Sequence, residues 1–236
     1  MKPWEILSDS VTAAGTRLTL WRRDRLYVIK VDGRDLMASD AHGSEEAMAA
    51  LACHGLERED QPRVLVGGLG MGFTLRAVLD ALSPAARVTV AELSPELAAW
   101  NRGPLALLAG RPLDDPRVAL SLGDVGELLR ASRAAWHAVL LDVDNGPVAL
   151  TPGNETLYTV AGLEVARRAL RPMGRLVVWS AFDDRGFTHR LRQAGFRPSV
   201  EHARSRGKRG GRRHTLFLGV ARPSSEVPSY PGRSRD

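Results

Sequence analysis

The chain has 236 residues, of which 44% are hydrophobic and 25% are charged, and its formal net charge is +6. These proportions are ordinary for a globular protein and exclude collagen, coiled coil and general disorder. No apolar run approaches the ~18 residues that a membrane span needs, and the first ten residues lack the apolar core of a signal peptide. The single cysteine, Cys53, excludes an internal disulfide and a multi-cysteine metal site. We therefore expect a cytoplasmic protein without a membrane partner.

The positive charge gathers in one segment. Residues 203–213 contain six Lys and Arg residues and no acidic residue, so this segment alone carries the whole net charge. A local patch of this kind attracts an anionic partner. We call it the basic segment 203–213, and two interpretations stay open: it meets an anionic acceptor or a nucleic acid, or it is a solvated turn.

The N-terminal part predicts a small extension. Two short runs with the composition of strands, residues 16–22 and 26–32, predict a β-hairpin. Residues 45–56 then have the composition of a helix. These features divide the chain into an N-terminal β-hairpin extension (residues 1–40), a main domain (41–222) and a disordered Pro- and Ser-rich tail (223–236).

From residue 63 onward, short apolar strands alternate with helical segments. The predicted strands are residues 63–67, 87–92, 118–122, 138–142 and 175–180, and the predicted helices are residues 73–82, from 94 onward, 125–132, 157–170 and 184–194. Two closing strands, residues 197–203 and 214–221, have no helix between them, so the last strand should run antiparallel. The pattern predicts an α/β fold, a Rossmann-like doubly wound sheet of seven strands with helices on both faces.

A glycine-rich turn follows the first of these strands. In VLVGGLGMGFTLR, residues 64–76, Gly68, Gly70 and Gly72 form the pattern G-x-G-x-G where a strand passes into a helix. Glycine permits a positive φ and the close approach of a nucleotide or nucleoside to the backbone. The turn therefore predicts a binding site for such a molecule, although glycine turns also serve packing alone.

Carboxylates follow the next three strands. Glu92 ends the second strand, where a carboxylate can accept hydrogen bonds from both hydroxyls of a ribose. Asp124 lies just past the third strand, in position to meet an adenine amino group, and Asp142 ends the fourth. The carboxyl ends of strands line the ligand crevice in a doubly wound sheet. Each carboxylate alone is explained by a helix cap or a turn, but together with the glycine turn they indicate a nucleoside site.

The glycine spacing bears on which nucleoside binds. A dinucleotide fingerprint needs a third glycine at the position of Phe73, so a nicotinamide-dependent oxidoreductase is an alternative that this turn disfavours. The spacing, the position of Asp124 and the closing hairpin fit S-adenosylmethionine (AdoMet) better. A second alternative is a catalytically silent module that binds a nucleoside or a nucleic acid.

The order of six stretches carries a family resemblance. They are HGSEEAMAAL, VLVGGLGMGFTLR, VTVAELSP, DDPRVALSLGDVGELL, AVLLDVDNGP and LYTVAGLEVARRALRPMGRLVVWS. Over residues 16–222 the chain resembles the spermidine synthase-like (polyamine aminopropyltransferase-like) family of class I AdoMet-dependent transferases. The resemblance implies AdoMet or decarboxylated AdoMet as the donor, a donor pocket at Gly68, Gly70, Glu92 and Asp124, and a reacting centre faced by Asp142 or Asp144. It also implies a homodimer as a candidate assembly.

Two departures from the family pattern bear on the transferred group. Polyamine synthases of this family usually carry an aspartate where Met71 stands, and that acid helps to hold the donor amine; an ammonium without a partner is costly to bury. The Tyr-His-Glu stretch of the family is not reproduced either, although Glu45 and Glu46 lie near its place. Because the basic segment 203–213 would also repel a diamine, methyl transfer is slightly favoured over aminopropyl transfer.

Several residues are candidates for the acceptor side. Asp142 can orient an amine acceptor or take its proton, with Asp144 as second candidate, for which capping of the following turn is an equal explanation. Tyr158, Trp179, Glu45 and Glu46 are acceptor-side candidates, with packing as the alternative for Tyr158 and Trp179. The histidines lack the spacing of metal ligands, so no metal is expected.

Overall fold

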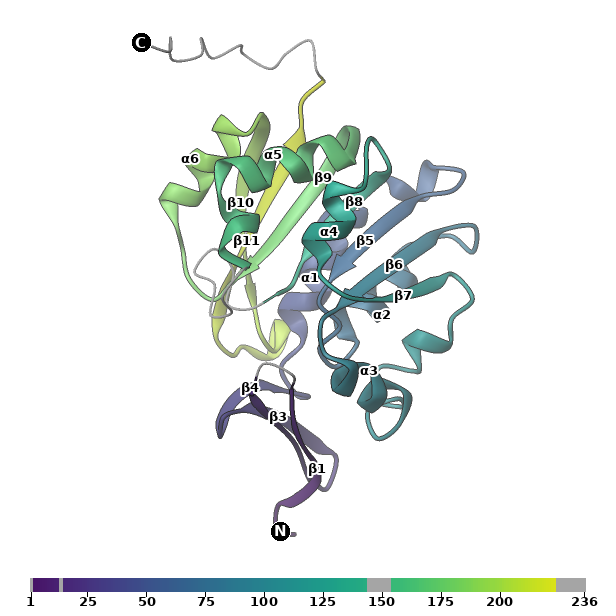
Figure 1. Ribbon diagram of the computed structural model, residues 1–236, viewed down its shortest axis with the longest axis vertical. Coiled ribbons are helices and arrows are strands. Elements are labelled where there is room, and N and C mark those ends of the chain that lie inside the picture. The colour runs from purple at the N-terminus through teal and green to yellow at the C-terminus, as the bar shows by residue number, and fades with distance from the viewer. Residues whose placement is uncertain (1, 13–14, 144–153, 224–236) are drawn as a thin grey trace.

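The computed structural model describes residues 2–12, 15–143 and 154–223 (Figure 1). The chain forms a four-stranded and a seven-stranded sheet. The small sheet consists of β1 (Glu5–Val11), β2 (Arg17–Arg23), β3 (Leu26–Val31) and β4 (Arg34–Ala38). The large sheet has the order β10–β11–β9–β8–β5–β6–β7 and consists of β5 (Arg63–Gly67), β6 (Arg87–Glu92), β7 (Val118–Leu122), β8 (Trp136–Leu141), β9 (Leu170–Ser180), β10 (Phe196–Arg204) and β11 (Arg213–Ala221).

Six α-helices connect these strands in the described part of the chain. They are α1 (Gly43–Cys53), α2 (Phe73–Ala81), α3 (Pro95–Arg102), α4 (Val125–Arg130), α5 (Val160–Ala169) and α6 (Arg185–Gln193). Short 3-10 helices lie at η1 (Leu56–Arg58), η2 (Pro112–Asp114), η3 (Asn154–Tyr158) and η4 (Gly207–Arg209).

The predicted doubly wound sheet of seven strands is confirmed. The strands β5 to β9 pair in parallel, and β11 runs antiparallel to both β9 and β10, as expected for the last strand. The bounds of β5, β6 and β7 agree with the prediction residue for residue. A buried parallel strand is a continuous apolar run, so its limits are visible in the sequence.

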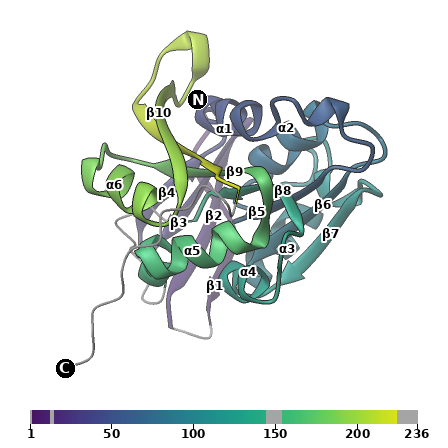
Figure 2. The same cartoon turned by 90° about the horizontal axis from the view of Figure 1, so that it is seen from above.

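Helices cover both faces of the large sheet (Figure 2). On one face, α4, α5 and α6 pack on the strands and bury Leu129, Leu163 and Phe187. On the other face, α1 and α2 pack on the strands and bury Met48 and Leu75. Both faces of the central strands are therefore closed to water, and a ligand can reach the sheet only at an edge.

The N-terminal extension is larger than predicted. The expected hairpin is present as β2 and β3, and a further strand pairs on each side of it. The two extra strands, EILSDSV and RDLMA, are mostly exposed, so their sequences lack a clear apolar alternation. The small sheet ends at Ala38, near the expected domain boundary at residue 40, which stays a prediction.

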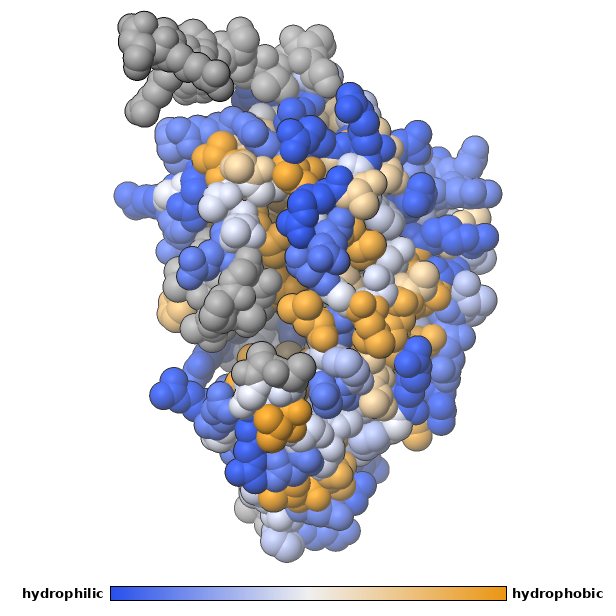
Figure 3. Space-filling view, in the orientation of Figure 1, coloured by the Kyte–Doolittle hydropathy of each residue, from blue (hydrophilic) through white to orange (hydrophobic). Residues whose placement is uncertain are grey.

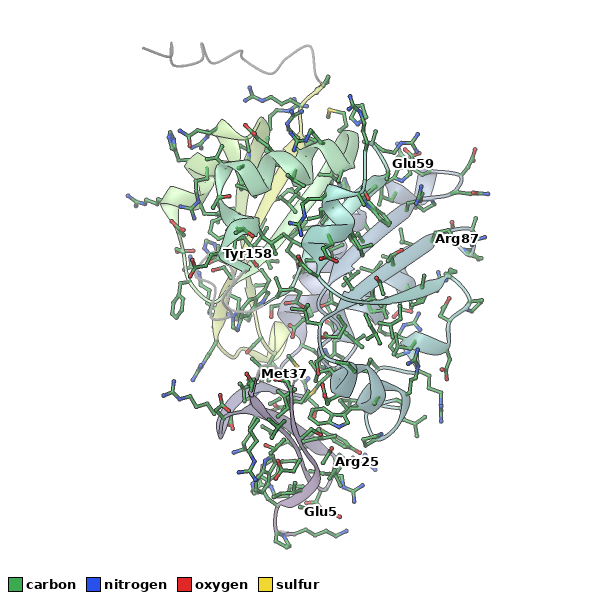
Figure 4. All side chains as sticks on the ribbon, viewed as in Figure 1. Glu5, Arg25, Met37, Glu59, Arg87 and Tyr158 are labelled. Atoms are coloured by element: carbon green, nitrogen blue, oxygen red, sulfur yellow. The ribbon has the colours of Figure 1, made fainter. Side chains whose placement is uncertain are left out.

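The small sheet packs against the glycine turn. Met71 is buried in one cluster with Leu18, Leu20 and Ile29 of the small sheet. Met37 lies where the small sheet meets the main body (Figure 4), and its thioether is so close that a Cβ at Gly70 would lie 3.2 Å from it. On the side shown in Figure 3, apolar residues gather over this middle part of the molecule, between mostly hydrophilic ends. The extension therefore covers the turn where the ligand is expected.

Two elements differ from the prediction near Tyr158. Helix α5 begins at Val160 instead of residue 157, because Thr159 caps it by accepting a hydrogen bond from the Gly162 backbone N–H at 3.1 Å. Tyr158 consequently lies in the 3-10 helix η3. Strand β9 begins at Leu170, directly after α5, so it is longer than the expected 175–180.

None of the described helices is long and apolar enough to cross a membrane. Two sequence predictions lie outside the described residues: the role of Asp144 and all but the first residue of the expected tail 223–236.

The carboxyl edge of the large sheet depends on a close approach between two strands. Gly68 follows β5 with φ +92°, and a Cβ at this position would lie 2.3 Å from the carbonyl oxygen of Asp142, which follows β8. The glycine N–H donates to the carbonyl of Ala91 at 2.9 Å, and the Asp142 N–H donates to the carbonyl of Gly67 at 2.9 Å. A side chain at Gly68 would force these strand ends apart.

We predict that Gly68→Ala destabilises the fold by about 2–5 kcal/mol. The left-handed conformation accounts for about 1–2 kcal/mol of this loss, and the forced separation of β5 from β8 for about 1–3 kcal/mol. Urea unfolding measures the change. Gly33→Ala is the matched control, because Gly33 has φ +78° but open space around its missing Cβ, so it should lose only the first part. Equal losses in the two variants would contradict the close approach.

Candidate active site

The buried side-chain amide of Asn101 forms a hydrogen bond to the glycine turn that follows β5. The side-chain Nδ2 of Asn101 in α3 donates to the carbonyls of Gly70 at 2.8 Å and Leu97 at 2.9 Å. Its Oδ1 lies where a Cβ at Gly72 would come within 2.9 Å. Sequence analysis missed Asn101, since a single polar residue in a helix gives no signal of its own. The amide holds the turn so that its glycine backbone faces the sheet edge.

Glu92 lies beside this turn. Its carboxylate is buried and accepts hydrogen bonds from the backbone N–H of Leu69 at 2.9 Å and of Ser94 at 2.8 Å. Burial raises the pKa of Glu92, and the backbone N–H groups oppose that rise. Each oxygen keeps a further lone pair, so the carboxylate can still accept a ribose hydroxyl. Its place at the end of β6 is the one the sequence predicted, and its donor role stays a prediction.

Two exposed leucines flank Glu92, and sequence analysis did not single them out. Leu122 pairs with Glu92 across the β6–β7 ladder, and Leu93 follows Glu92 directly. Each is 55% exposed, although the residues around them are polar or buried. An apolar surface beside a carboxylate at a strand end suits the face of a purine ring.

Asp124 has a local structural role. It caps α4, with Oδ1 accepting from the Gly126 N–H at 2.8 Å and Oδ2 paired with Arg130 at 3.1 Å. This is the capping function that the sequence left open. Contact with an adenine amino group stays a prediction, and such a contact would compete with the Arg130 pair.

Asp142 and Glu45 form an acidic pair at the carboxyl edge. Asp142 follows β8, and its Oδ2 accepts a 2.6 Å hydrogen bond from the Thr74 hydroxyl in α2. Burial raises the pKa of Asp142, and the Thr74 hydrogen bond opposes the rise. Glu45 comes from the first turn of α1, where burial, followed by the charge of Asp142, raises its pKa to about 7. Two carboxyls far apart in the sequence thus share one charge environment beside the glycine turn.

Glu46, the neighbour of Glu45, lies against His42 at the surface. It is exposed, and its Oε1 lies 2.8 Å from Nδ1 of His42. The His42 ring stacks on Phe73, the first residue of α2, with a centroid distance of 4.3 Å. Of the two acceptor-side glutamates in the prediction, Glu45 is the one whose pKa the charge of Asp142 raises.

Tyr158 and Trp179 approach the same edge from opposite faces. The Tyr158 hydroxyl donates to the carbonyl of Val143 at 3.1 Å, and its ring packs edge-on against Phe187 in the core. Trp179 lies on the α1 face of β9, and its ring contacts His214 of β11 at a centroid distance of 4.6 Å. Trp179 Nε1 and His214 Nδ1 are buried without a hydrogen-bond partner among the described residues. Both acceptor-side roles stay predictions.

These groups fit an adenosine-type donor. The glycine backbone leaves room where side chains would clash, Glu92 offers acceptor lone pairs, and the exposed leucines offer an apolar surface. The acidic pair Glu45–Asp142 offers negative charge on the α1 side of the same edge. The arrangement therefore combines a nucleoside cradle with a place for a positively charged group.

We predict that Glu45 makes the folded state less stable as pH rises. Its pKa is raised from 4.5 to about 7 on folding, so the folded chain binds the proton more tightly than the unfolded chain does. The free energy of unfolding should therefore fall between about pH 4.5 and pH 7, and Glu45→Gln should remove part of that fall. Urea unfolding at several pH values measures it. Glu127→Gln, an exposed glutamate in the first turn of α4, is the control and should leave the pH dependence unchanged.

The large sheet and the small sheet together match solved spermidine synthases. The chain superposes on the spermidine synthase of Thermotoga maritima with a TM-score of 0.72 and 17% identity, over 91% of this chain and 72% of that one. A spermidine synthase in complex with the transition state analogue AdoDATO also gives 0.72 and 17%, over 94% and 75%. A probable spermidine synthase from Corynebacterium glutamicum gives 0.64 and 19%, over 93% and 81%.

A sequence relative supports the same family. A polyamine aminopropyltransferase of Korarchaeum cryptofilum is 28% identical over 127 residues, which are 53% of this chain and 37% of that protein. The match thus spans little more than a third of the relative's length. No family model matches the chain. The resemblance inferred from the sequence is confirmed: the chain has the fold of the spermidine synthase-like family and a distant sequence relationship to its polyamine aminopropyltransferases.

Proposed function

We propose that this chain transfers an aminopropyl group from decarboxylated AdoMet to an amine acceptor. The observation that carries the proposal is the acidic pair Glu45–Asp142 beside the glycine turn. Carboxylates attract ammonium groups, and a buried ammonium needs such a partner. The names of the relatives, a polyamine aminopropyltransferase and spermidine synthases, support aminopropyl transfer and not the methyl transfer that the sequence slightly favoured.

The acidic pair also bears on the choice of donor. AdoMet carries a carboxylate that the decarboxylated form lacks, and that carboxylate would be repelled near Glu45 and Asp142. The missing aspartate at Met71 was the main argument against the decarboxylated donor. Met71 is buried against the small sheet, while Glu45 supplies negative charge from α1 instead. A donor ammonium can therefore find a carboxylate here although Met71 stands where the family has an aspartate.

The remaining groups orient the two substrates. Glu92 accepts the ribose hydroxyls, the leucines 93 and 122 cover one face of the purine, and the glycine turn lets the nucleoside lie against the backbone. The donor supplies an activated carbon next to its sulfonium. Alignment of an amine with that carbon can contribute about 7–11 kcal/mol through proximity.

The chemical step needs a proton acceptor. The amine nitrogen must be neutral to form its bond to the aminopropyl carbon, while the carbon–sulfur bond breaks and 5′-methylthioadenosine leaves. Asp142 accepts one hydrogen bond from Thr74 and keeps further lone pairs, so it can orient the amine and take its proton. Glu45, with a pKa raised to about 7, holds a second exchangeable proton at the same site. A homodimer, a nucleic-acid partner and a cytoplasmic location stay predictions.

To identify the donor, purified protein is incubated with an equimolar mixture of amines and with either decarboxylated AdoMet or AdoMet, and the products are measured. We expect 5′-methylthioadenosine to be released with decarboxylated AdoMet at a rate at least 100-fold above that with AdoMet, with an aminopropylated amine seen by mass spectrometry. Methylated products from AdoMet would contradict the proposal and restore methyl transfer. Binding of either donor without any product would support the silent binding module, and binding of a reducing dinucleotide alone would support the oxidoreductase.

We predict that Asp142→Asn lowers kcat at least 100-fold and raises the dissociation constant of decarboxylated AdoMet about tenfold, because the donor ammonium then loses one of its two carboxylates. The amide keeps the shape of the side chain and its contact with Thr74, but it cannot take a proton. Single-turnover kinetics and calorimetric titration separate the two quantities. Asp80→Asn, an exposed position on α2, is the control. Full activity in Asp142→Asn would assign the proton to another group.

A further inference from the structure

The basic segment 203–213 is built into the edge that carries the acidic pair. Since β10 ends beside β11 and β11 runs antiparallel to β9, the turn between β10 and β11 lies at the same edge as the carboxyl end of β9. Figure 2 shows this turn reaching past α1, near its first residues. The six positive charges therefore stand at the acceptor end of the site, as the sequence suggested, and the structure shows what holds them there.

Three contacts dock the turn on the start of α1. The Gly43 N–H donates to the carbonyl of Ser205 at 2.7 Å. A Cβ at Gly43 would lie 2.3 Å from the backbone nitrogen of Gly207, so only glycine permits this approach. Arg206 pairs with Asp40 at 2.6 Å. The turn between β10 and β11 is therefore held in place by a backbone hydrogen bond and an ion pair, unlike the solvated turn that was one of the two interpretations of the sequence.

The docked turn places Lys208 and Arg209 in the wall of a cavity. The cavity has a volume of about 190 Å³ and is lined by His42, Gly43, Glu46, Arg206, Gly207, Lys208 and Arg209. The Arg206 charge is balanced by Asp40, and Glu46 lies against His42. Within the described part of the chain, Lys208 and Arg209 form no ion pair. Their two positive charges face the cavity together with one carboxylate, that of Glu46, so the lining keeps an excess of positive charge.

A strip of aromatic rings joins the acidic pair to this turn. The ladder pairs Leu141 with Val178, which puts Asp142 level with Trp179 on the neighbouring strand. Trp179 contacts the His214 ring, and His214 directly follows the basic segment 203–213. The buried Nε1 of Trp179 and Nδ1 of His214 lack partners among the described residues. The strip thus offers ring faces along which an acceptor's carbon chain can lie.

We propose that the acceptor carries an anionic group as well as its amine, and that the anion binds in the cavity at Lys208 and Arg209. This inference rests on the proposed transferase function, and it names the substrate class: an aminoalkyl carboxylate or an aminoalkyl phosphate. The amine lies at Glu45 and Asp142, and the carbon chain runs along Trp179 and His214. A simple diamine would place its second ammonium against the two cations, so it is the poorer acceptor.

The test compares three acceptors with decarboxylated AdoMet: 1,4-diaminobutane, 4-aminobutyrate and 2-aminoethyl phosphate. The wild-type kcat/KM for one of the anionic amines should exceed that for the diamine at least tenfold, and the better of the two identifies carboxylate or phosphate. Lys208→Gln/Arg209→Gln should lose that preference at least tenfold through KM, while its kcat/KM for the diamine rises. Arg204→Gln/Arg212→Gln is the matched control, because it removes the same charge from the same segment outside the cavity, and it should stay within threefold of wild type.

The outcomes separate the two proposals. A wild-type preference for the diamine would overturn this inference and leave aminopropyl transfer in place. An anionic preference that the cavity variant keeps, or that the control loses equally, would overturn the assignment to Lys208 and Arg209. If no acceptor gives a product, the proposed function fails, and calorimetric titration with 2-aminoethyl phosphate then decides: binding lost only in the cavity variant supports the anion site, and any other result overturns it.

Discussion

The rest of the site depends on the close approach between the glycine turn after β5 and the end of β8. A Cβ at Gly68 would lie 2.3 Å from the carbonyl oxygen of Asp142, so these two segments of the chain can touch only because residue 68 is glycine. This contact sets the carboxyl edge of the central strands, with Glu92 of β6 on one side and Asp142 on the other. Both acids consequently face one piece of backbone, but their surroundings differ: backbone N–H groups donate to Glu92, whereas the Thr74 hydroxyl donates to Asp142.

The first turn of α1 separates opposite charges. On its inner side Glu45 shares a buried environment with Asp142, which raises the pKa of both carboxyls. On its outer side Gly43 touches the turn that carries Lys208 and Arg209. Burial strengthens charge interactions at the two acids, whereas water weakens them at the exposed cations.

Carboxylates at strand ends serve two purposes in this fold. Asp124 and Asp184 both begin helices and accept hydrogen bonds from backbone N–H groups in the first turn. Glu92 and Asp142 instead lie between strands and helices from different parts of the chain. A helix-capping carboxylate needs only the backbone of its own helix, whereas Glu92 and Asp142 are bound by groups from other elements. The position of a carboxylate at a strand end is the same in both cases, so it does not show which kind of contact the residue makes.

The sheet, the order of its elements and the glycine turn could all be predicted from the sequence, because buried parallel strands are continuous apolar runs and glycine often follows their last residue. Sequence analysis missed β1 and β4, whose exposed residues lack an apolar pattern. Two features become visible in the folded chain alone: the charge of Asp142 acts on Glu45, and the basic segment 203–213 is held against α1. Both results come from packing between segments far apart in the chain, and local periodicity contains no information about such contacts.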